Sequence, residues 1–264
     1  MTDLHSHTYF SHDGKCTIEE LVNTAINKKM KYLGISEHID YDCLYNNIDI
    51  KQFNPEAYFP TAFNIKEKFK DQITILVGIE CGFYDAPQIN KMYFDLIEKY
   101  KPEYVISSIH MVEKTDYYFA NYGDKKTVYE KYLNYIYKSI HSDYYYDIIG
   151  HLGYVERYAP YEDKQMRYKD FKESFDRILK GIIEKDKILE INSSSTLDFT
   201  PFLPTEDVFE AYYKLGGRKV SFGSDTHTSQ RLLDKREQIV KILKNIGFDH
   251  FTIPINKKHI DFEF

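Results

Sequence analysis

The sequence predicts an α/β fold in which parallel strands alternate with helices and close into a barrel. Short apolar segments rich in Ile and Val alternate with longer amphipathic segments along the chain, a pattern typical of a parallel sheet covered by helices. No Ser/Gly-rich linker, internal repeat or low-complexity tract interrupts this alternation. Seven or eight βα units in 264 residues fit one barrel, although the length alone would also allow two ordinary domains.

Seven segments are predicted to be strands because they are short, mostly apolar throughout and rich in Ile and Val, as strands buried on both faces are. They are residues 2–8, 31–36, 74–80, 104–109, 147–151, 188–192 and 219–224.

Seven helices are predicted between and after these strands: residues 17–30, 55–70, 89–100, 126–140, 168–184, 205–215 and 230–246. Thr17 and Glu20 have the spacing of a capping box at the first helix. Pro55 suits a first helical turn, and Gly247 follows the last helix as a terminating residue.

The composition excludes several classes of protein. With 35 Lys+Arg against 41 Asp+Glu, the net charge is −6, so neither nucleic acid nor an anionic membrane is an expected partner. The first residues lack the basic start and apolar core of a signal peptide, and no apolar run is long enough to span a membrane. Cys16, Cys43 and Cys81 are odd in number and widely spaced, which argues against a disulfide framework or a zinc ribbon. We therefore expect a reduced, cytoplasmic protein of enzyme size.

Polar residues follow nearly every predicted strand at its carboxyl end. They are His5, His7, His12 and Asp13; Glu37 and His38; Glu80; His110; His151; Glu190 and Asn192; and Asp225 and His227. In a barrel of parallel strands these ends converge on one face, where active sites are built. Because residues from His5 to His227 can meet only if nearly the whole chain forms one closed domain, this distribution favours the single barrel.

Imidazole and carboxylate groups without thiolates suit Zn, Mn or Fe. In His5-x-His7 and in Asp225-x-His227, the two side chains of each pair share one face of a strand. A single strand-end His is more often a hydrogen-bonded structural residue, but this many in one layer indicates metal binding. There are more ligands than one ion can take, Glu80 could bridge two ions, and two-metal sites are typical of phosphoester hydrolysis.

Other residues are expected to be structural. His141, His250 and His259 lie at a helix end or in the C-terminal tail and are predicted to be solvated, and the three cysteines are predicted to be core or surface residues. The aromatic run 144–146 is interpreted as packing.

The motifs HSH (His5, His7), SEH (His38), GIE (Glu80), SIH (His110), GH (His151) and SDTH (Asp225, His227) resemble the PHP superfamily of metal phosphoesterases. The stretches GHLGYVERYAPYEDK, LEIN and GSDTH are similar to the PHP-type histidinol-phosphate phosphatases, and the resemblance covers essentially the whole length. It implies one PHP phosphoesterase domain over residues 1–264. It also implies a distorted (β/α)7 TIM-like barrel with the active site at the carboxyl ends of its strands.

The resemblance also implies three divalent metal ions (Zn, Mn or Fe) and their ligands. The first ion would be held by His5, His7, Glu80 and Asp225; the second by Glu80 as a bridge, His110 and His151; the third by Asp13, His38 and His227. Asp13 is chosen because its spacing from His7 matches the family. His12, one position away, is interpreted as lying behind the ligands or facing solvent.

Arg157, in GYVERY, matches an Arg that the family uses to hold the substrate phosphate, and its fork suits a phosphate better than Lys would. The alternative is a surface ion pair with Glu156 or Asp163. Some relatives carry a further Arg after the EIN motif, where this chain has a serine run, so hydroxyl groups would assist Arg157. The serines concerned are Ser193, Ser194 and Ser195.

The implied reaction is hydrolysis of L-histidinol phosphate to L-histidinol and inorganic phosphate, a step of histidine biosynthesis. A hydroxide shared by the first two metals would attack phosphorus in line, with Glu80 as their bridge. The third metal and Arg157 would neutralise the phosphoryl charge. Asp225 or His227 would relay a proton to the leaving oxygen. Acidic residues after the site motifs are candidates to pair with the substrate amine: Asp40, Asp42 and Glu113.

Three alternatives remain at this point. One is a PHP phosphoesterase acting on another small phosphomonoester or a nucleotide, although the net charge of −6 and the absence of an evident basic stripe disfavour a nucleic-acid substrate. A metal-dependent amidohydrolase would also be a barrel with a His-x-His pair and a late Asp. A non-catalytic metal-binding regulatory module would have no need of so complete a set of ligands.

Overall fold

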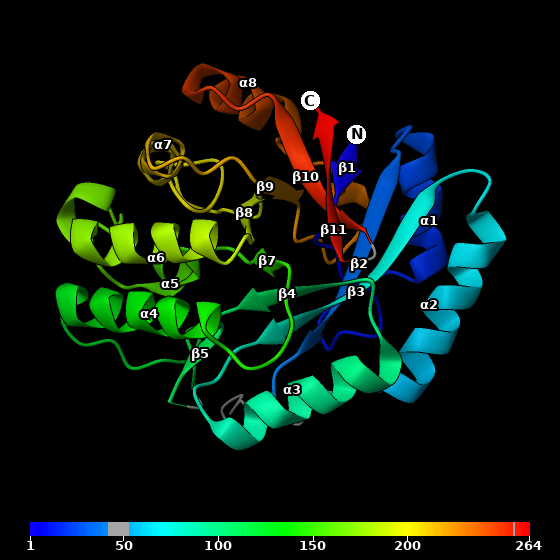
Figure 1. The fold of residues 1–264 in the computed structure, drawn as a ribbon, viewed down its shortest axis with the longest axis horizontal. Coiled ribbons are helices and arrows are strands. Elements are labelled where there is room, and N and C mark those ends of the chain that lie inside the picture. The colour runs from blue at the N-terminus through cyan, green and yellow to red at the C-terminus, as the bar shows by residue number, and fades with distance from the viewer. Residues whose placement is uncertain (42–52, 114, 256) are drawn as a thin grey trace.

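The computed structural model describes residues 1–41, 53–113, 115–255 and 257–264. Its centre is a seven-stranded sheet with the order β1-β2-β3-β4-β7-β8-β9, in which every neighbouring pair is parallel (Figure 1). The strands are β1 (Thr2–Asp3), β2 (Tyr32–Ile39), β3 (Thr74–Gly82), β4 (Tyr104–Ser108), β7 (Ile148–Ile149), β8 (Ile188–Asn192) and β9 (Val220–Gly223).

The first and last strands of this sheet meet and close the barrel. Leu4 N donates to Phe222 O at 2.9 Å, His7 N to Thr226 O at 2.8 Å, and Asp225 N to His5 O at 2.8 Å. The predicted distorted (β/α)7 barrel is therefore confirmed. Of the first predicted strand, residues 2–8, only Thr2–Asp3 forms a regular strand. The residues after it still run parallel to the segment around residues 222–226 and form hydrogen bonds with it.

Helices surround the sheet, with α1 to α3 along one side and α4 and α6 along the other (Figure 1). They are α1 (Ile18–Asn27), α2 (Pro55–Phe69), α3 (Pro87–Tyr100), α4 (Lys125–Ile140), α5 (Tyr154–Tyr158), α6 (Lys172–Glu184), α7 (Glu206–Lys214) and α8 (Arg236–Ile246). The predicted capping box forms, because Thr17 Oγ1 accepts from Glu20 N while Glu20 accepts from Thr17 N. None of the helices in the described residues is long and apolar enough to cross a membrane.

Two predicted helices begin later than expected. The segment Tyr168–Phe171 is a 3₁₀ turn that precedes α6, and a second 3₁₀ turn at Ser229–Arg231 is separate from α8. The five-residue α5 was not predicted because it is shorter than the window in which a helical period can be recognised. A short antiparallel pair, β5 (Met111–Val112) and β6 (Thr115–Asp116), follows β4.

The C-terminal segment is a hairpin and not the solvated tail that the sequence suggested. Strands β10 (His250–Ile255) and β11 (Lys258–Glu263) pair antiparallel, and β10 packs against β9 (Figure 1). Ile253 packs with Leu4, Tyr104 and other buried residues at the amino ends of the barrel strands. The side chains of His250 and His259 are only 20% and 16% exposed. Strand β10 was not predicted because Pro254 interrupts its alternating pattern.

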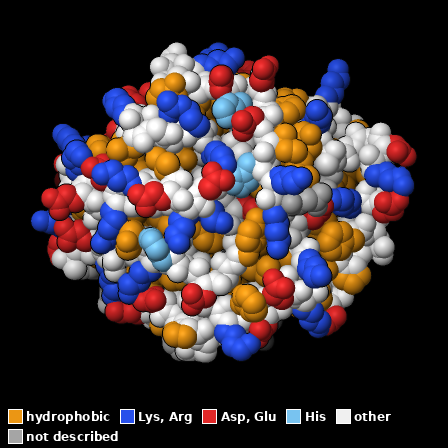
Figure 2. Space-filling view, viewed as in Figure 1, with side chains coloured by type: hydrophobic (Ala, Val, Ile, Leu, Met, Phe, Trp, Pro, Cys, Tyr) orange, Lys and Arg blue, Asp and Glu red, His pale blue; other side chains and the backbone are white. Residues whose placement is uncertain are grey.

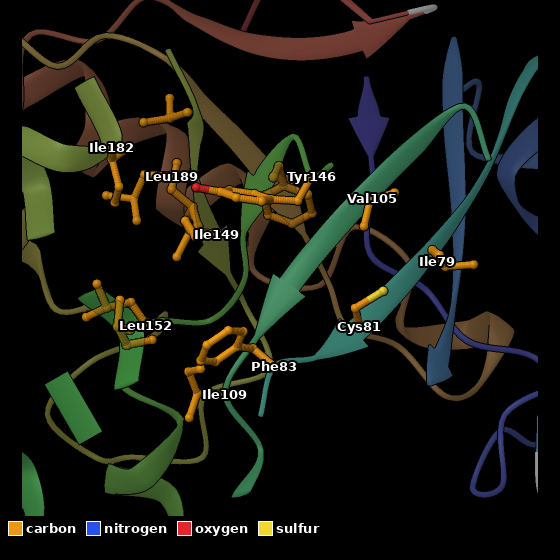
Figure 3. Close-up of a cluster of buried hydrophobic side chains, with 14 of the residues drawn as sticks. Ile79, Cys81, Phe83, Val105, Ile109, Tyr146, Ile149, Leu152, Ile182 and Leu189 are labelled. Atoms are coloured by element: carbon orange, nitrogen blue, oxygen red, sulfur yellow. The ribbon is translucent and has the colours of Figure 1, made fainter. Parts of the chain in front are cut away.

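The side chains of the barrel strands alternate between two apolar clusters. Val105, Ile149 and Leu189 point outward and pack with residues such as Ile182 of α6 (Figure 3). Tyr104 belongs to the second cluster, inside the barrel, where its hydroxyl donates to Leu4 O at 2.7 Å.

The remaining structural expectations are met where the chain is described. His141 is the C-cap residue of α4 and is exposed. Cys16 and Cys81 are buried free thiols, whereas Cys43 lies outside the described residues. Tyr144 and Tyr146 are buried in the outer cluster, as the packing interpretation of this run predicted.

Candidate active site

The predicted ligands converge at the carboxyl ends of the barrel strands. His38 and Glu80 lie in β2 and β3 and are direct partners in the parallel ladder. The others follow the strands: His5 and His7 follow β1, His110 follows β4, His151 follows β7, and Asp225 and His227 follow β9. Most are buried, and the exposed fractions of the His38, His227 and Asp13 side chains are 11%, 26% and 44%. The segments brought together span nearly the whole described chain.

The four residues of the first expected group surround one point. Nε2 of His5 lies 3.2 Å from Glu80 Oε2 and 3.7 Å from Asp225 Oδ1. Nε2 of His7 lies 3.6 Å from the same glutamate oxygen and 3.2 Å from the same aspartate oxygen. Two imidazole nitrogens and two carboxylate oxygens thus face one another without any intervening side chain.

The other oxygen of Glu80 belongs to the second group. Glu80 Oε1 lies 3.1 Å from His110 Nε2 and 2.8 Å from His151 Nε2, and these two nitrogens are 3.1 Å apart. Because Glu80 directs one oxygen to each group, it has the arrangement of a bridging carboxylate.

The third expected group lies closer to the surface. His227 Nε2 is 3.3 Å from His38 Nε2 and 3.0 Å from Asp13 Oδ2, while Asp13 Oδ1 is 3.8 Å from His38 Nε2. The ring of His12 is 5.7 Å from that of His38, centroid to centroid, and its Nε2 lies 3.9 Å from Asp13 Oδ2. This geometry favours Asp13 over His12 as the third member.

Within the described residues, four sets of three side chains have ligand atoms that all lie within 4.8 Å of one another. They are His5, His7 and Asp225; His5, Glu80 and His151; His7, His38 and His227; and His38, Asp40 and His110. Three of these sets contain only predicted ligands. The fourth adds Asp40.

Unsatisfied atoms test whether this site fits metal ions. His5 Nε2, His7 Nε2, His38 Nδ1 and Glu80 Oε2 are buried, and although they face one another none of them makes a well-oriented hydrogen bond. Buried polar atoms of this kind are rare and costly unless something else satisfies them. Divalent cations would do so, and the donor set is the nitrogen and oxygen mixture that Zn, Mn and Fe accept. The residues present therefore fit a polymetallic site.

The opposite ring nitrogens of several ligands are held by other side chains. His5 Nδ1 lies 2.5 Å from Glu190 Oε1, and His110 Nδ1 lies 2.8 Å from Asp40 Oδ1. His7 Nδ1 lies 3.3 Å from the hydroxyl of Ser11, which also donates to Glu37. Such partners fix the ring orientation and direct Nε2 toward the metal position.

Opposite charges compensate burial at the centre of the site. Burial opposes ionisation of Glu80, but His5, His110 and His38 hold the pKa of its carboxyl well below the usual range. Burial, with the neighbouring imidazoles of His38 and His227, lowers the pKa of His7 well below its usual value. A neutral His7 is the form that donates an electron pair to a metal.

Arg157 lies beside this cluster and not at the surface. It is carried by α5, and its side chain is 16% exposed. Its Nη1 is 3.6 Å from Asp225 Oδ2, and its Nη2 donates to Ser194 O at 3.3 Å. The alternative ion pairs are not formed, because Glu156 accepts from Met166 N and Asp163 pairs with lysine and arginine neighbours of its own.

A cavity of about 210 Å³ joins Arg157 to the ligands. It is lined by His12, Asp13, His38, Asp40, His110, Asp116, His151, Tyr154, Arg157, Tyr158, Asp225 and His227. The three serines expected to assist Arg157 are not among these residues. The hydroxyl of Ser194 donates to Asp225 Oδ2, and that of Ser195 to Thr200 O, so both are engaged within the protein.

One of the acidic residues proposed to meet the substrate amine, Asp40, lines the cavity. Asp40 orients His110, Asp42 lies outside the described residues, and Glu113 is an exposed partner of Lys131. Asp116, which sequence reasoning missed, is buried and lines the cavity. It stands in a polar stretch without a motif, so no sequence signal singled it out.

Comparison with known proteins identifies the family of this chain. The model of the PHP domain family matches residues 3–194, and the chain belongs to this family. A histidinol-phosphatase of Lactococcus lactis is 28% identical over 98% of both chains. A probable histidinol-phosphatase of Clostridium acetobutylicum is 29% identical over 92% of both.

Solved structures extend the comparison to the fold. The crystal structure of a histidinol phosphate phosphatase from Lactococcus lactis, complexed with zinc, L-histidinol and phosphate, superposes with a TM-score of 0.85. It is 26% identical, and the match covers 98% of both chains. A putative histidinol phosphatase from Listeria monocytogenes is 19% identical with a TM-score of 0.77, which supports the fold alone.

We predict that Asp40→Asn weakens metal binding by about 10- to 100-fold, because His110 loses the carboxylate that orients its ring. Affinity can be measured by competition with a chromogenic chelator. Asp95→Asn, which removes an exposed partner of Lys91, is the matched control and should bind metal normally. Unchanged affinity in Asp40→Asn would show that the Asp40 contact does not set the ligand geometry.

We also predict a pH effect from Glu156, which lies beside Arg157 in α5. Burial raises the pKa of its carboxyl from 4.5 to about 8. A raised folded-state pKa adds stability that is complete below the unfolded-state pKa and is lost as pH rises toward 8. Glu156→Gln should therefore gain free energy of unfolding relative to the parent chain between pH 5 and 8, by roughly 3 kcal/mol. Urea denaturation at several pH values measures it, and a pH-independent difference would contradict the assignment.

Proposed function

We propose that this chain is a metal-dependent phosphomonoesterase that hydrolyses L-histidinol phosphate to L-histidinol and inorganic phosphate. The observation that carries the proposal is the position of Arg157, in one cavity with three groups of potential metal ligands. The similarity to named histidinol-phosphatases over more than nine-tenths of the chain supports the choice of substrate. The related Lactococcus structure, which holds zinc, L-histidinol and phosphate, supports it further.

The proposed ligands are His5, His7, Glu80 and Asp225 for one ion; Glu80, His110 and His151 for a second; and Asp13, His38 and His227 for a third. Zn, Mn or Fe bound there would supply a water of lowered pKa and positive charge for the phosphoryl oxygens. Glu80 keeps the first two groups at a fixed separation through its two oxygens. The carboxylates of Glu190 and Asp40 hold the rings of His5 and His110 in place.

Arg157 binds and orients the phosphoryl group in this mechanism. Its guanidinium offers paired N–H donors that match two phosphate oxygens. Asp225 turns Oδ1 toward His5 and His7 and Oδ2 toward Arg157, so it couples the phosphate contact to the ligands. The proton that the attacking water gives up passes through Asp225 or His227 to the leaving oxygen, since both residues line the cavity. No protein nucleophile is required.

Specific features disfavour the alternatives. Arg157 beside the ligands offers a phosphate contact, which favours an ester over an amide substrate, and the open cavity there favours an enzyme over a regulatory metal module. A nucleic-acid substrate would call for a basic surface, but lysines and arginines are interspersed with acidic residues on the face drawn in Figure 2. Another small phosphomonoester remains the second candidate, because Arg157 recognises any phosphate.

We further propose that residues 1–264 act as one PHP phosphoesterase domain and that the enzyme works in the cytoplasm. Ligands from His5 to His227 in one cluster support the first proposal. Cys16 and Cys81, two buried unpaired thiols, are consistent with the second because reduced cysteines are usual in that compartment.

The proposal is tested by turnover of metal-loaded protein with L-histidinol phosphate and with p-nitrophenyl phosphate. We expect kcat/KM to be at least about 100-fold higher for L-histidinol phosphate, because only this substrate can engage groups beyond the phosphate site. Chelation should abolish turnover of both esters, and readdition of Zn, Mn or Fe should restore it. Equal turnover of the two esters would rule out the specific assignment while leaving a general phosphatase.

We also predict that Arg157→Lys lowers kcat/KM by about 10-fold or more on both esters, because a point charge replaces a fork with paired donors. Metal content should be unchanged, since Arg157 is not among the proposed ligands. Arg167→Lys, at a partly exposed arginine that pairs with Asp163 outside the cavity, is the matched control. Full activity of Arg157→Lys on both esters would exclude a bidentate phosphate contact.

A further inference from the structure

One wall of the substrate cavity carries a carboxylate that the mechanism does not use. Asp116 is the last residue of β6 and pairs across the β5–β6 hairpin with Met111, which directly follows the proposed ligand His110. Asp116 lines the same cavity as His110, His151 and Arg157 and is 6% exposed. The hairpin therefore brings a buried acid to the edge of the reaction centre.

The described residues compensate this carboxylate only in part. Asp116 Oδ1 accepts one hydrogen bond, from Tyr118 N at 2.7 Å. No lysine or arginine in the described segments forms an ion pair with Asp116. Desolvating a carboxylate is costly when no opposite charge accompanies it. A cation brought by the substrate would offset that cost.

Asp116 and Arg157 act on a common neighbour, Tyr154. The pKa of the Tyr154 hydroxyl is raised by burial and by the Asp116 carboxylate and is lowered by the guanidinium of Arg157. The Arg157 guanidinium carbon lies 5.5 Å from the centre of the Tyr154 ring, and this ring is 5.3 Å from that of His110, centroid to centroid. The cavity thus presents a positive group, Arg157, and a negative group, Asp116, near the ring of Tyr154, which forms an aromatic wall.

We propose that Asp116 determines specificity by pairing its buried carboxylate with an ammonium group of the substrate, on the carbon next to the ester CH2. The inference rests on the proposed phosphatase function and names the group that selects the substrate. L-histidinol phosphate carries such an ammonium, and its phosphate is placed by Arg157. The ammonium is the better partner because it is charged at neutral pH, whereas most imidazole rings are not. The imidazole of the substrate then lies against the aromatic wall.

The test compares three phosphate esters on the metal-loaded parent chain and on Asp116→Asn. L-histidinol phosphate has both the amine and the imidazole, 2-aminoethyl phosphate has the amine alone, and 3-(imidazol-4-yl)propyl phosphate has the imidazole alone. In Asp116→Asn we expect kcat/KM to fall about 10- to 100-fold for the two esters that carry an amine, which is the usual effect of losing a hydrogen bond to a charged group. For the imidazole ester it should change by less than about threefold, because Asn preserves the bond from Tyr118 N.

Glu113→Gln is the matched control because Glu113 lies in the same hairpin region but is exposed and paired with Lys131. It should leave all three rates unchanged. If Asp116→Asn fails to fold, Asp116→Ser replaces it, since a serine hydroxyl can accept the same backbone N–H bond in this turn. Metal content and Tm are measured for each variant, so that a damaged ligand site is recognised.

A second readout does not depend on turnover. Calorimetric titration of the metal-loaded protein with L-histidinol should show about 10- to 100-fold weaker binding to Asp116→Asn, whereas 3-(imidazol-4-yl)propan-1-ol should bind both proteins equally. Equal losses on all three esters would make Asp116 a structural residue and overturn the proposal. A loss confined to compounds with the imidazole would assign Asp116 to the ring and also overturn it. If the parent chain hydrolyses none of the esters, the proposed function fails, and the titration still decides on Asp116.

Discussion

The position of Glu80 is the constraint on which the rest of the site depends. Its carboxylate is fully buried at the carboxyl end of β3, and its two oxygens face different groups of imidazoles. In the parallel register, Glu80 is opposite His38 on β2 and Ile106 on β4. A shift of one residue in either ladder would turn the carboxylate into the outer apolar cluster, where no partner is available. The same strand register that forms the barrel therefore also places Glu80 among the proposed metal ligands.

Barrel closure provides the other half of the site. Backbone hydrogen bonds between the segments after β1 and β9 place His5 and His7 beside Asp225. Asp225 adopts a left-handed conformation with φ of 49°, which Asp tolerates better than most residues. This conformation, held by the bond from Asp225 N to His5 O, lets the side chain face both the histidines and Arg157. The strained backbone of Asp225 and the hydrogen bonds that close the barrel thus both position the Asp225 carboxylate in the site.

Much of this arrangement could be predicted because the chemistry lies at the ends of recognisable strands. An apolar run that stops at a His or an acid identifies both the strand and its functional end, as TILVGIE does for Glu80. Pairings between distant segments could not be read in the same way. The bond between His5 and Glu190 joins residues 185 positions apart, and the contact between Asp40 and His110 joins residues 70 positions apart.

The features that were missed have local physical reasons. Helix α5 has only five residues, and a proline interrupts the alternating pattern of β10. Asp116 is an acid in a polar stretch, and only the return of the chain through β5 and β6 buries it. Burial determines whether such a residue can bind a cation strongly, because an exposed carboxylate interacts weakly with a cation while a desolvated one interacts strongly.

The charge distribution of the molecule follows the same principle. The chain carries a net charge of −6, yet the group proposed to bind phosphate is an arginine within the cavity, beside positions suited to cations. Attraction for a small anion can therefore arise inside the site, where the effective dielectric constant is low, and a basic surface is unnecessary. A cavity lined by Arg157 and Asp116 is complementary to a substrate that carries both charges. A purely anionic ester would leave the carboxylate uncompensated, so selectivity can come from the cost of binding the wrong molecule as much as from attraction to the right one.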